Sequence, residues 1–246
     1  MPAIRYALAV IAFLGLSLAQ AQPLTFKSSS SQTPLLELYT SEGCSSCPPA
    51  DRWLAELIRL PETELRVLAL AFHVDYWDYI GWKDPFASPA HTDRQRTLAR
   101  ANRQTSIYTP EFLINDREAR GSRQMLEKIR QANLKPSPVQ LELIADKQPQ
   151  QLELKLNSIY SENSRLQVEF IVFENNLSNQ VDAGENAGHQ LTHHQVVRYL
   201  SPSLALKPAI QYEIQLKPEW DPQQLGIAVI VRSEDSQFIQ SLHGLI

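Results

Sequence analysis

Long apolar runs are almost absent from this chain of 246 residues. A helix that spans a membrane needs about 20 consecutive, mainly apolar residues. One apolar stretch, Tyr6 to Ala19, occurs near the start, and no later segment is long and apolar enough to cross a bilayer. We therefore expect no membrane span in the mature chain.

The first 21 residues have the order of a secretory signal peptide. A short basic start with Arg5 precedes the apolar stretch, and Ala19-Gln20-Ala21 comes before a polar continuation. An uncleaved membrane anchor is the alternative, although the apolar stretch is short for that role. We predict cleavage near Ala21 and a mature protein that is periplasmic or secreted.

An excess of charge of one sign is also lacking. The chain has 23 lysines and arginines against 27 aspartates and glutamates, for a net charge of −4. The basic residues are scattered among the acidic ones, whereas nucleic-acid-binding proteins gather them in a patch or stripe. The composition therefore argues against a nucleic-acid partner.

Cysteine is the scarcest informative residue. The only two cysteines, Cys44 and Cys47, lie in "SEGCSSCPPADRW", residues 41–53. Export to an oxidising compartment would make a disulfide possible, and the close spacing would make it local. The pair could be a redox couple, a metal clip or a small structural bridge.

The first half of the chain predicts alternating strands and helices. Strands are expected at 34–40, 64–74, 111–115 and 117–121, and helices from Pro48 to near Pro61, at 90–104 and at 122–133. This order is typical of an α/β domain. We place that domain at residues 34–135, after a flexible segment at 22–33.

The second half has a different pattern. Beyond "LKPSPVQ" (134–140), short segments alternate apolar and polar residues, as half-buried strands do. They lie at 139–145, 151–157, 166–174, 194–200, 210–216, 225–231 and 237–243. Strands of this kind and spacing predict a mostly antiparallel β-sandwich domain at residues 138–246.

The position of the cysteines favours the redox interpretation. A C-x-x-C between a strand and a helix places Cys44 at the helix N-terminus, where the dipole and free N–H groups stabilise a thiolate. Cys44 would be the exposed nucleophile, and Cys47, one turn into the helix, would resolve a mixed disulfide. Glu42 is a weaker candidate for a functional residue of the site, because a carboxylate near Cys44 would disfavour the thiolate form of that cysteine.

Two other interpretations stay open. A structural disulfide that closes a loop of about four residues would stabilise the folded state by roughly 2 kcal/mol, whereas one closing a fifteen-residue loop would give ~3 kcal/mol. A purely structural role would therefore gain little stability from this spacing. A copper or zinc site would need further ligands, because Cys44 and Cys47 supply two of the four that zinc usually takes. His73 and Asp75, or a partner protein, would have to supply the others. In the leading interpretation no cofactor other than the redox disulfide is expected.

Two motifs are expected to lie beside the cysteines. "YTPEFLIN" places Thr109-Pro110 directly before a predicted strand, where thioredoxin-type folds have a cis-proline that shapes the groove for a thiol partner; we predict that Pro110 is cis. "FHVDYWDYIGW" leaves the carboxyl end of a predicted strand, the working edge of a parallel sheet. His73 and Asp75 could relay protons there, or Asp75 could cap a turn.

The segment "GENAGHQLTHHQVVRY" (184–199) contains three histidines. His193 and His194 are adjacent, so along a strand their side chains point to opposite faces. That argues against a shared metal ion with His189, and we predict an ordinary or interdomain hairpin.

Four motifs together resemble a known family: "LELYTSEGCSSCPPAD", "AFHVDYWDYIGWKDPFASP", "YTPEFLIN" and "GENAG…LTH…VVR". They are similar to exported proteins grouped as domain-of-unknown-function family 1223. The resemblance implies a thioredoxin-like fold for residues 34–135 and export, but no established reaction. The positions that match the motifs are Cys44, Cys47, His73, Asp75, Trp77, Asp78, Gly81, Trp82, Thr109, Pro110, Gly184, Glu185, Asn186 and His193.

Taken together, these features predict a periplasmic thiol–disulfide oxidoreductase that acts on protein thiols or disulfides. Cys44 would attack and Cys47 would resolve, with Pro110 shaping the groove. The alternative is a non-enzymatic protein in which the cysteines bind metal with His73 or form a static disulfide.

Overall fold

The computed structural model describes residues 22–162 and 164–246, and the predicted signal peptide at 1–21 lies outside them. The helical elements are α1 (Pro48–Leu57), η1 (Asp78–Ile80), α2 (Pro89–Ala101) and α3 (Ser122–Asn133). Proline occupies the first positions of α1 and α2, where a missing N–H costs nothing.

Strands dominate the described residues. They are β1 (Leu24–Lys27), β2 (Leu35–Thr40), β3 (Leu68–His73), β4 (Glu111–Ile114), β5 (Arg117–Ala119), β6 (Gln140–Lys147), β7 (Gln151–Ile159), β8 (Leu166–Glu174), β9 (Leu177–Gln180), β10 (Gln190–His193), β11 (Val196–Leu200), β12 (Leu204–Ala205), β13 (Ala209–Gln215), β14 (Leu225–Ser233) and β15 (Phe238–Leu245). Most segments predicted from the apolar pattern are confirmed as strands.

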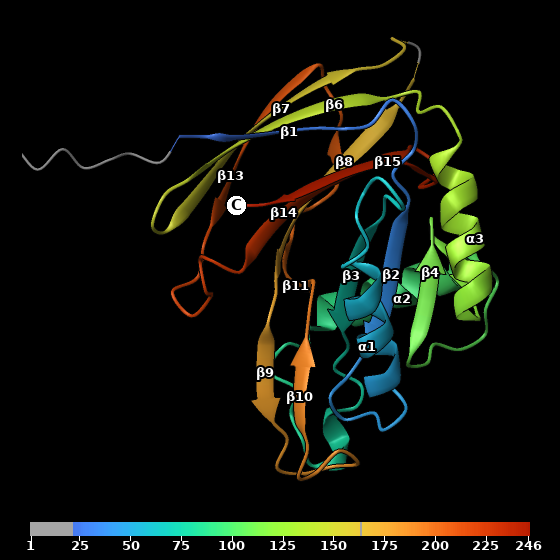
Figure 1. The fold of residues 1–246 in the computed structure, drawn as a ribbon, viewed down its shortest axis with the longest axis vertical. Helices are drawn as coiled ribbons and strands as arrows, with labels where there is room; N and C mark the ends of the chain where they lie inside the picture. Colours follow the sequence, from blue (N-terminus) through green and yellow to red (C-terminus); the bar gives the residue numbers. More distant parts are fainter. Residues whose placement is uncertain (1–21, 163) are drawn as a thin grey trace, which may run out of the picture.

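The strands form two sheets and a hairpin (Figure 1). A nine-stranded sheet has the order β15-β14-β8-β11-β3-β2-β4-β5, with β12 paired to β8. A four-stranded antiparallel sheet has the order β1-β6-β7-β13. Strands β9 and β10 pair only with each other, and residues 182–189 form the tip of this hairpin.

The predicted fold class, an α/β thioredoxin-like domain followed by a separate β-sandwich, is wrong. Strand β11, from the second half, pairs in parallel with β3 at Val196 and Ala71, so β8, β14 and β15 continue the sheet of the first half. The described chain is mainly β, with three α-helices. Apolar periodicity identifies a strand, but it does not identify the strand's neighbour in the sheet.

The N-terminal segment also differs from the prediction. Residues 22–33, expected to be flexible, contain β1, which pairs antiparallel with β6 from Leu24 to Lys27. The boundary near residue 136 between separately folding units stays a prediction, although strands from both sides of it share one sheet.

The hydrophobic core has three parts. On one face of β2 and β3, Leu36 packs with Leu54 of α1 and Ile129 of α3. On the other face, Phe72 packs with Leu98 of α2. The third part lies between the four-stranded sheet and the second-half strands of the large sheet, where β6, β7, β8 and β14 bury their apolar faces. Helices on both faces explain why β2 and β3 are buried throughout and mainly apolar.

A buried ion network also joins the two halves. Arg232 of β14 makes two hydrogen bonds to Asp116, at 2.8 and 3.1 Å, and one to Glu169 at 2.5 Å. Arg94 of α2 contacts the same Glu169 at 3.3 Å and fully buried Glu37 of β2 at 2.7 Å. These charges are stable in the interior because each has a partner of opposite sign.

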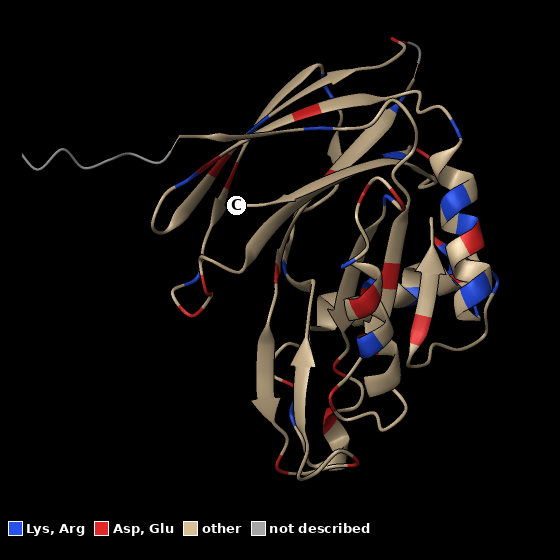
Figure 2. Ribbon diagram, viewed as in Figure 1, with Lys and Arg blue, Asp and Glu red and all other residues tan. Residues whose placement is uncertain are grey.

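Surface charge is mixed. Figure 2 shows lysines and arginines interspersed with acidic residues along α3 rather than gathered on one face. Within the described residues, none of the helices has the length and apolar character that crossing a membrane requires.

Candidate functional site: the cysteine turn and its surroundings

The two cysteines lie in the turn that joins β2 to α1. We call residues 41–47 the cysteine turn. Cys44 and Cys47 form a disulfide, with their Cα atoms 5.4 Å apart. Both side chains are fully buried. The expectation that Cys44 is exposed is therefore wrong for this oxidised form.

Helix α1 begins at Pro48, as predicted, but the expected position of Cys47 within it is wrong. Cys47 is its N-cap residue rather than a residue one turn inside. The next two residues, Pro48 and Pro49, have no N–H, while the N–H groups of Ala50 and Asp51 both bond to the carbonyl of Cys47. These residues of the helix start therefore offer no free N–H group to a Cys44 thiolate.

A hydroxyl group lies beside the sulfur of Cys44. Ser46 Oγ is 3.3 Å from Cys44 Sγ, within the range of a hydrogen bond to sulfur. After reduction of the disulfide, this hydroxyl is placed to donate a hydrogen bond to a Cys44 thiolate. Ser45 contributes its backbone N–H to a different contact, described below.

The Thr109-Pro110 peptide bond is cis, as predicted. Glu111, the next residue, begins β4 and pairs with Tyr39, one residue before the end of β2. Pro110 therefore lies at the end of β2 from which the cysteine turn leaves. Thr109 Oγ1 accepts a 2.7 Å hydrogen bond from Trp77 Nε1, which ties this loop to the aromatic segment after β3.

Asp75 is occupied by local contacts. Its Oδ1 atom accepts a 2.5 Å hydrogen bond from Thr92 Oγ1 of α2, and its backbone carbonyl accepts one from the N–H of Asp78. These contacts match the alternative in which Asp75 caps a turn. A role for Asp75 in relaying protons to the cysteines stays a prediction.

His73 ends β3 and is fully buried. Its Nδ1 lies 2.7 Å from Asp84 Oδ2, which also accepts a 2.9 Å hydrogen bond from the N–H of Glu42 in the cysteine turn. Burial opposes protonation of His73, but the Asp84 carboxylate outweighs it, so the pKa of His73 is raised. Burial also opposes ionisation of Asp84, yet His73 lowers the pKa of that carboxyl.

Glu42 is the most connected side chain at the site and is fully buried. Its Oε1 lies 3.1 Å from His193 Nε2 of β10 and accepts a 3.1 Å bond from Asn179 Nδ2 of β9. Its Oε2 accepts a 2.9 Å bond from Trp82 Nε1. The hairpin and the aromatic segment therefore meet at one carboxylate beside the cysteines.

The two buried histidines join these groups into a single cluster. The rings of His73 and His193 lie 4.7 Å apart, and His193 Nδ1 is 3.8 Å from Asp51 Oδ2 of α1. Burial raises the pKa of Asp51. We call Glu42, Asp51, His73, Asp84 and His193 the acid–histidine cluster.

The cluster has an excess of acidic groups. In the described part of the chain, no lysine or arginine forms an ion pair with any of its five members. His73 Nε2 and His193 Nδ1 also lack hydrogen-bond partners among the described residues. Buried carboxylates without a lysine or arginine nearby are costly, and burial raises the pKa of Asp51, whereas His73 lowers that of Asp84.

Metal ligation was the other chemistry considered for this site. Within residues 22–162 and 164–246, no group of three or more histidine, cysteine, aspartate or glutamate side chains is arranged to hold a metal ion. The alternative in which Cys44, Cys47 and His73 bind copper or zinc after reduction stays a prediction.

The hairpin tip covers the cysteine turn. Asn186 Nδ2 donates to the carbonyl of Glu42 at 2.7 Å and to that of Cys44 at 3.0 Å. Glu185 Oε2 accepts a 2.9 Å hydrogen bond from the N–H of Ser45. The "GENAG" motif thus contacts the "SEGCSSC" motif across about 140 residues of sequence, which the hairpin prediction did not foresee.

The sequence predicted only part of this site. His73 was expected beside the cysteines, and its contact with Glu42 through Asp84 connects it to the cysteine turn. Asp51 and Asp84 were not predicted, since a lone carboxylate on a helix or loop resembles many solvated ones. Glu42 was expected to be a minor residue, because its partners come from distant segments.

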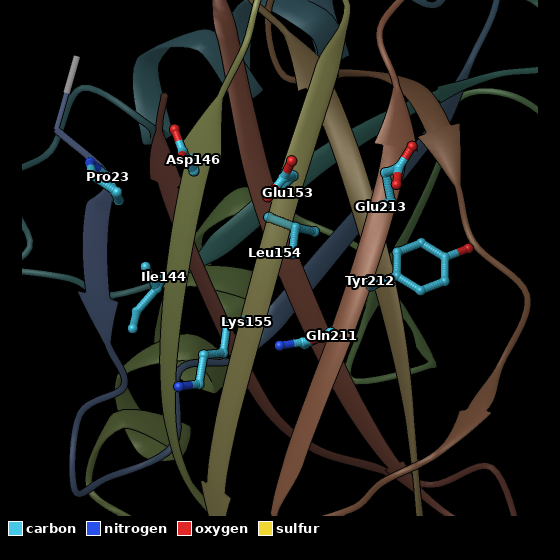
Figure 3. A pocket seen from close by; sticks show the side chains of 9 residues that line it. All are labelled: Pro23, Ile144, Asp146, Glu153, Leu154, Lys155, Gln211, Tyr212 and Glu213. Atoms are coloured by element: carbon cyan, nitrogen blue, oxygen red, sulfur yellow. The ribbon is translucent and has the colours of Figure 1, made fainter. Parts of the chain in front are cut away.

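A hollow of about 580 Å³ lies elsewhere, on the outer face of the four-stranded sheet (Figure 3). Its walls include Asp146, Glu153 and Glu213, which stand opposite one another on β6, β7 and β13. Each of these carboxylates accepts a hydrogen bond from a nearby glutamine. The hollow contains no residue of the cysteine turn and is not part of the site.

Two solved structures share this fold. Protein AGR_C_4864 from Agrobacterium tumefaciens is 22% identical, with a TM-score of 0.66 over 89% of this chain and 96% of the other. HBP35 of Porphyromonas gingivalis is 16% identical, with a TM-score of 0.69 over 89% of this chain and 76% of the other. At such identities the likeness shows the fold alone.

The comparison with curated proteins gives no significant match. A protein-family profile, described as "Protein of unknown function (DUF1223)", matches residues 35–232. The match spans β2 to β14, including the cysteine turn, the acid–histidine cluster and the hairpin. The chain therefore belongs to the DUF1223 family.

Proposed function

We propose that this chain is an exported thiol–disulfide exchange protein in which Cys44 and Cys47 alternate between disulfide and dithiol. The observation that carries the proposal is that the chain's only two cysteines form a disulfide in a strand-to-helix turn, directly against a buried acid–histidine cluster. Buried titratable groups gathered in this way are typical of functional sites. The signal-peptide pattern of residues 1–21 supports export.

The exchange needs only sulfur chemistry and proton transfer. A partner thiolate attacks Cys44 Sγ, the Cys44–Cys47 bond breaks, and the electron pair leaves on Cys47 Sγ. The second thiolate of the partner then attacks the partner sulfur of the mixed disulfide and releases Cys44 as a thiolate. The partner dithiol is oxidised by two electrons, the cysteine pair is reduced, and two protons pass from the partner to the two cysteines or to nearby bases.

The same steps in reverse reduce a partner disulfide, with Cys44 as the nucleophile and Cys47 as the resolving thiol. Asp51 is suited to exchange a proton with Cys47, because it is one helical turn away on α1. His193, 3.8 Å from Asp51, links that carboxylate to Glu42 on the other side of the pair.

A static disulfide is the second candidate function. The observation that favours it is the complete burial of both cysteines under the hairpin tip. In that case the bond would only hold the cysteine turn against Asn186, and the protein would act through another surface.

The reduction potential of the Cys44–Cys47 pair separates the two candidates. The mature protein is equilibrated in glutathione buffers without metal, and its thiols are counted by alkylation and gel shift. An exchange protein should have a potential between about −270 and −120 mV, the range of known exchange proteins. A potential below about −300 mV, typical of structural disulfides, would overturn the proposal.

Two variants assign the roles of the cysteines. Cys47→Ser should trap a mixed disulfide between Cys44 and a thiol-containing substrate protein, because the resolving thiol is missing. Cys44→Ser is the matched control and should trap none. If Cys44→Ser keeps the exchange activity of the wild type, the proposed assignment of the nucleophile is wrong.

A further inference from the structure

Access to the disulfide is the open question for any exchange reaction at this site. Cys44 and Cys47 are fully buried, although Ser45 and Ser46 between them are exposed. An attacking thiolate must reach one sulfur in line with the S–S bond. In this arrangement a partner protein cannot reach either sulfur.

The groups that close the site come from the hairpin. The amide of Asn186 is itself buried, and its two hydrogen bonds hold the carbonyls of Glu42 and Cys44. Glu185 holds the N–H of Ser45. The tip thus satisfies the carbonyl of Glu42 and the N–H of Ser45, which would otherwise need water or a partner, and it adds a second bond to the carbonyl of Cys44, which already accepts from the N–H of Cys47.

The tip also packs closely against the aromatic segment. Gly184 has a φ of +77°, and a Cβ atom there would lie 2.9 Å from Ile80 Cδ1. A Cβ at Gly43 would lie 3.1 Å from the same atom. Ile80 therefore lies against both the tip and the cysteine turn, and an added methyl group on either side would force a local shift.

The tip is closed on itself, which allows it to leave as a unit. The N–H of Gly188 bonds to the carbonyl of Val181 at 2.8 Å, and the N–H of Val181 bonds to the carbonyl of His189 at 2.9 Å. These bonds and the pairing of β9 with β10 do not involve the cysteine turn. Lifting the tip breaks its contacts with the turn but leaves the hairpin intact.

We propose that the hairpin tip is a gate over the Cys44–Cys47 disulfide, and that Asn186 is the positioning residue that holds it shut. The inference rests on the proposed function, since a gate matters only if the disulfide exchanges with partners. When the tip lifts, the carbonyl of Glu42 and the N–H of Ser45 become free, and the carbonyl of Cys44 keeps only its bond from the N–H of Cys47. An extended segment of a cysteine-containing protein could pair with these backbone groups while its thiolate reaches Cys44.

The test compares rates with equilibria. Reduction of the full mature protein by dithiothreitol and reoxidation by oxidised glutathione are followed by quenched alkylation in the wild type and in Asn186→Ala. Since each hydrogen bond contributes modestly to the closed state, loss of both Asn186 bonds should speed both reactions at least about tenfold. The ratio of oxidised to reduced protein in a redox buffer should change by less than about twofold.

Two further variants test whether a change in rate comes from the tip itself. Gly184→Ala should push the tip away from Ile80 and speed both reactions, without removing any side-chain hydrogen bond. Thr192→Ala is the matched control, because Thr192 is exposed on the same hairpin and its hydroxyl bonds, among the described residues, to Ser178 alone. It should react at the wild-type rate.

The outcomes separate the gate from the proposed function. Wild-type rates in folded Asn186→Ala and Gly184→Ala would overturn the gate, and so would a shift of the redox ratio as large as the change in rate. If Asn186→Ala reacts faster with dithiothreitol but neither it nor the wild type oxidises a reduced, unfolded substrate protein, the gate stands and the proposed function fails. If the wild type oxidises that substrate and Asn186→Ala is no faster in any assay, the function stands and the gate fails.

Discussion

Removal of the Arg232 side chain should destabilise the protein strongly. Arg232 is the sole side-chain partner of the Asp116 carboxylate among the described residues, through hydrogen bonds of 2.8 and 3.1 Å. Asp116 is only 8% exposed, so Arg232→Met would leave a buried carboxylate without a cation. Glu169 would keep its contact with Arg94, so most of the loss comes from Asp116.

The magnitude follows from these contacts. Breaking a buried ion pair by removing one partner costs about 3–5 kcal/mol. For a chain of this size, that corresponds to a fall in Tm of roughly 6–20 °C. Methionine keeps most of the side-chain volume, so the loss reflects the charge rather than a cavity.

Urea unfolding at pH 7, followed by tryptophan fluorescence and by far-ultraviolet circular dichroism, measures the effect. Arg165→Met is the matched control, because Arg165 is 82% exposed and pairs with Glu234 at 3.4 Å. An exposed pair of this kind contributes less than about 1 kcal/mol. Asp116→Asn in the Arg232→Met background should recover part of the loss, since the unpaired charge is then absent.

A loss below about 1 kcal/mol in Arg232→Met would refute the reasoning. The two spectroscopic probes also test the organisation of the chain. Arg232 lies in the second half and Asp116 in the first, so both halves should unfold in one transition. Two separate transitions would support independent domains at 34–135 and 138–246.

Two further predictions concern the site. In Ser46→Ala, the loss of a hydroxyl 3.3 Å from Cys44 Sγ removes a hydrogen bond to the thiolate of the reduced protein, so alkylation of Cys44 at pH 7 should be several-fold slower than in the wild type. Ser45→Ala is the matched control, and equal rates in the two variants would contradict the role of Ser46. Asp84 raises the pKa of His73 above the ordinary value of 6.5, so the stability from this pair is complete below pH 6.5 and is lost as the pH rises through the folded-state pKa. The difference in unfolding free energy between the wild type and His73→Gln should therefore be larger at pH 6 than at pH 9, and a difference that does not vary with pH would show that His73 gains no proton affinity on folding.

Local patterns in the sequence predicted the individual elements well. The run from Leu35 to Thr40 is apolar enough to be read as a buried strand, and Pro48 and Pro49 mark the start of α1. The alternation in the second half located β6, β7, β8, β13 and β14. These signals are local, because they depend on the period of side chains along one segment.

The sheet order could not be predicted in this way. The contact between β11 and β3 joins residues more than 120 positions apart, and nothing in the period of either strand specifies the other. The prediction of an α/β domain followed by a separate β-sandwich is wrong because of this pairing. Strand β1 was missed as well, because four residues with little burial produce no clear apolar pattern.

The sequence by itself indicated three features of the candidate site: one cysteine pair in a strand-to-helix turn, a proline expected to be cis at Pro110 and a histidine at the end of β3. Only the tertiary structure decided what surrounds them. Glu42 and Asn186 are 144 residues apart, and their contact exists because β11 places the hairpin over the cysteine turn. Burial of Cys44 and the raised pKa of His73 arise from this packing, since desolvation and charge pairing depend on neighbours in space rather than in sequence.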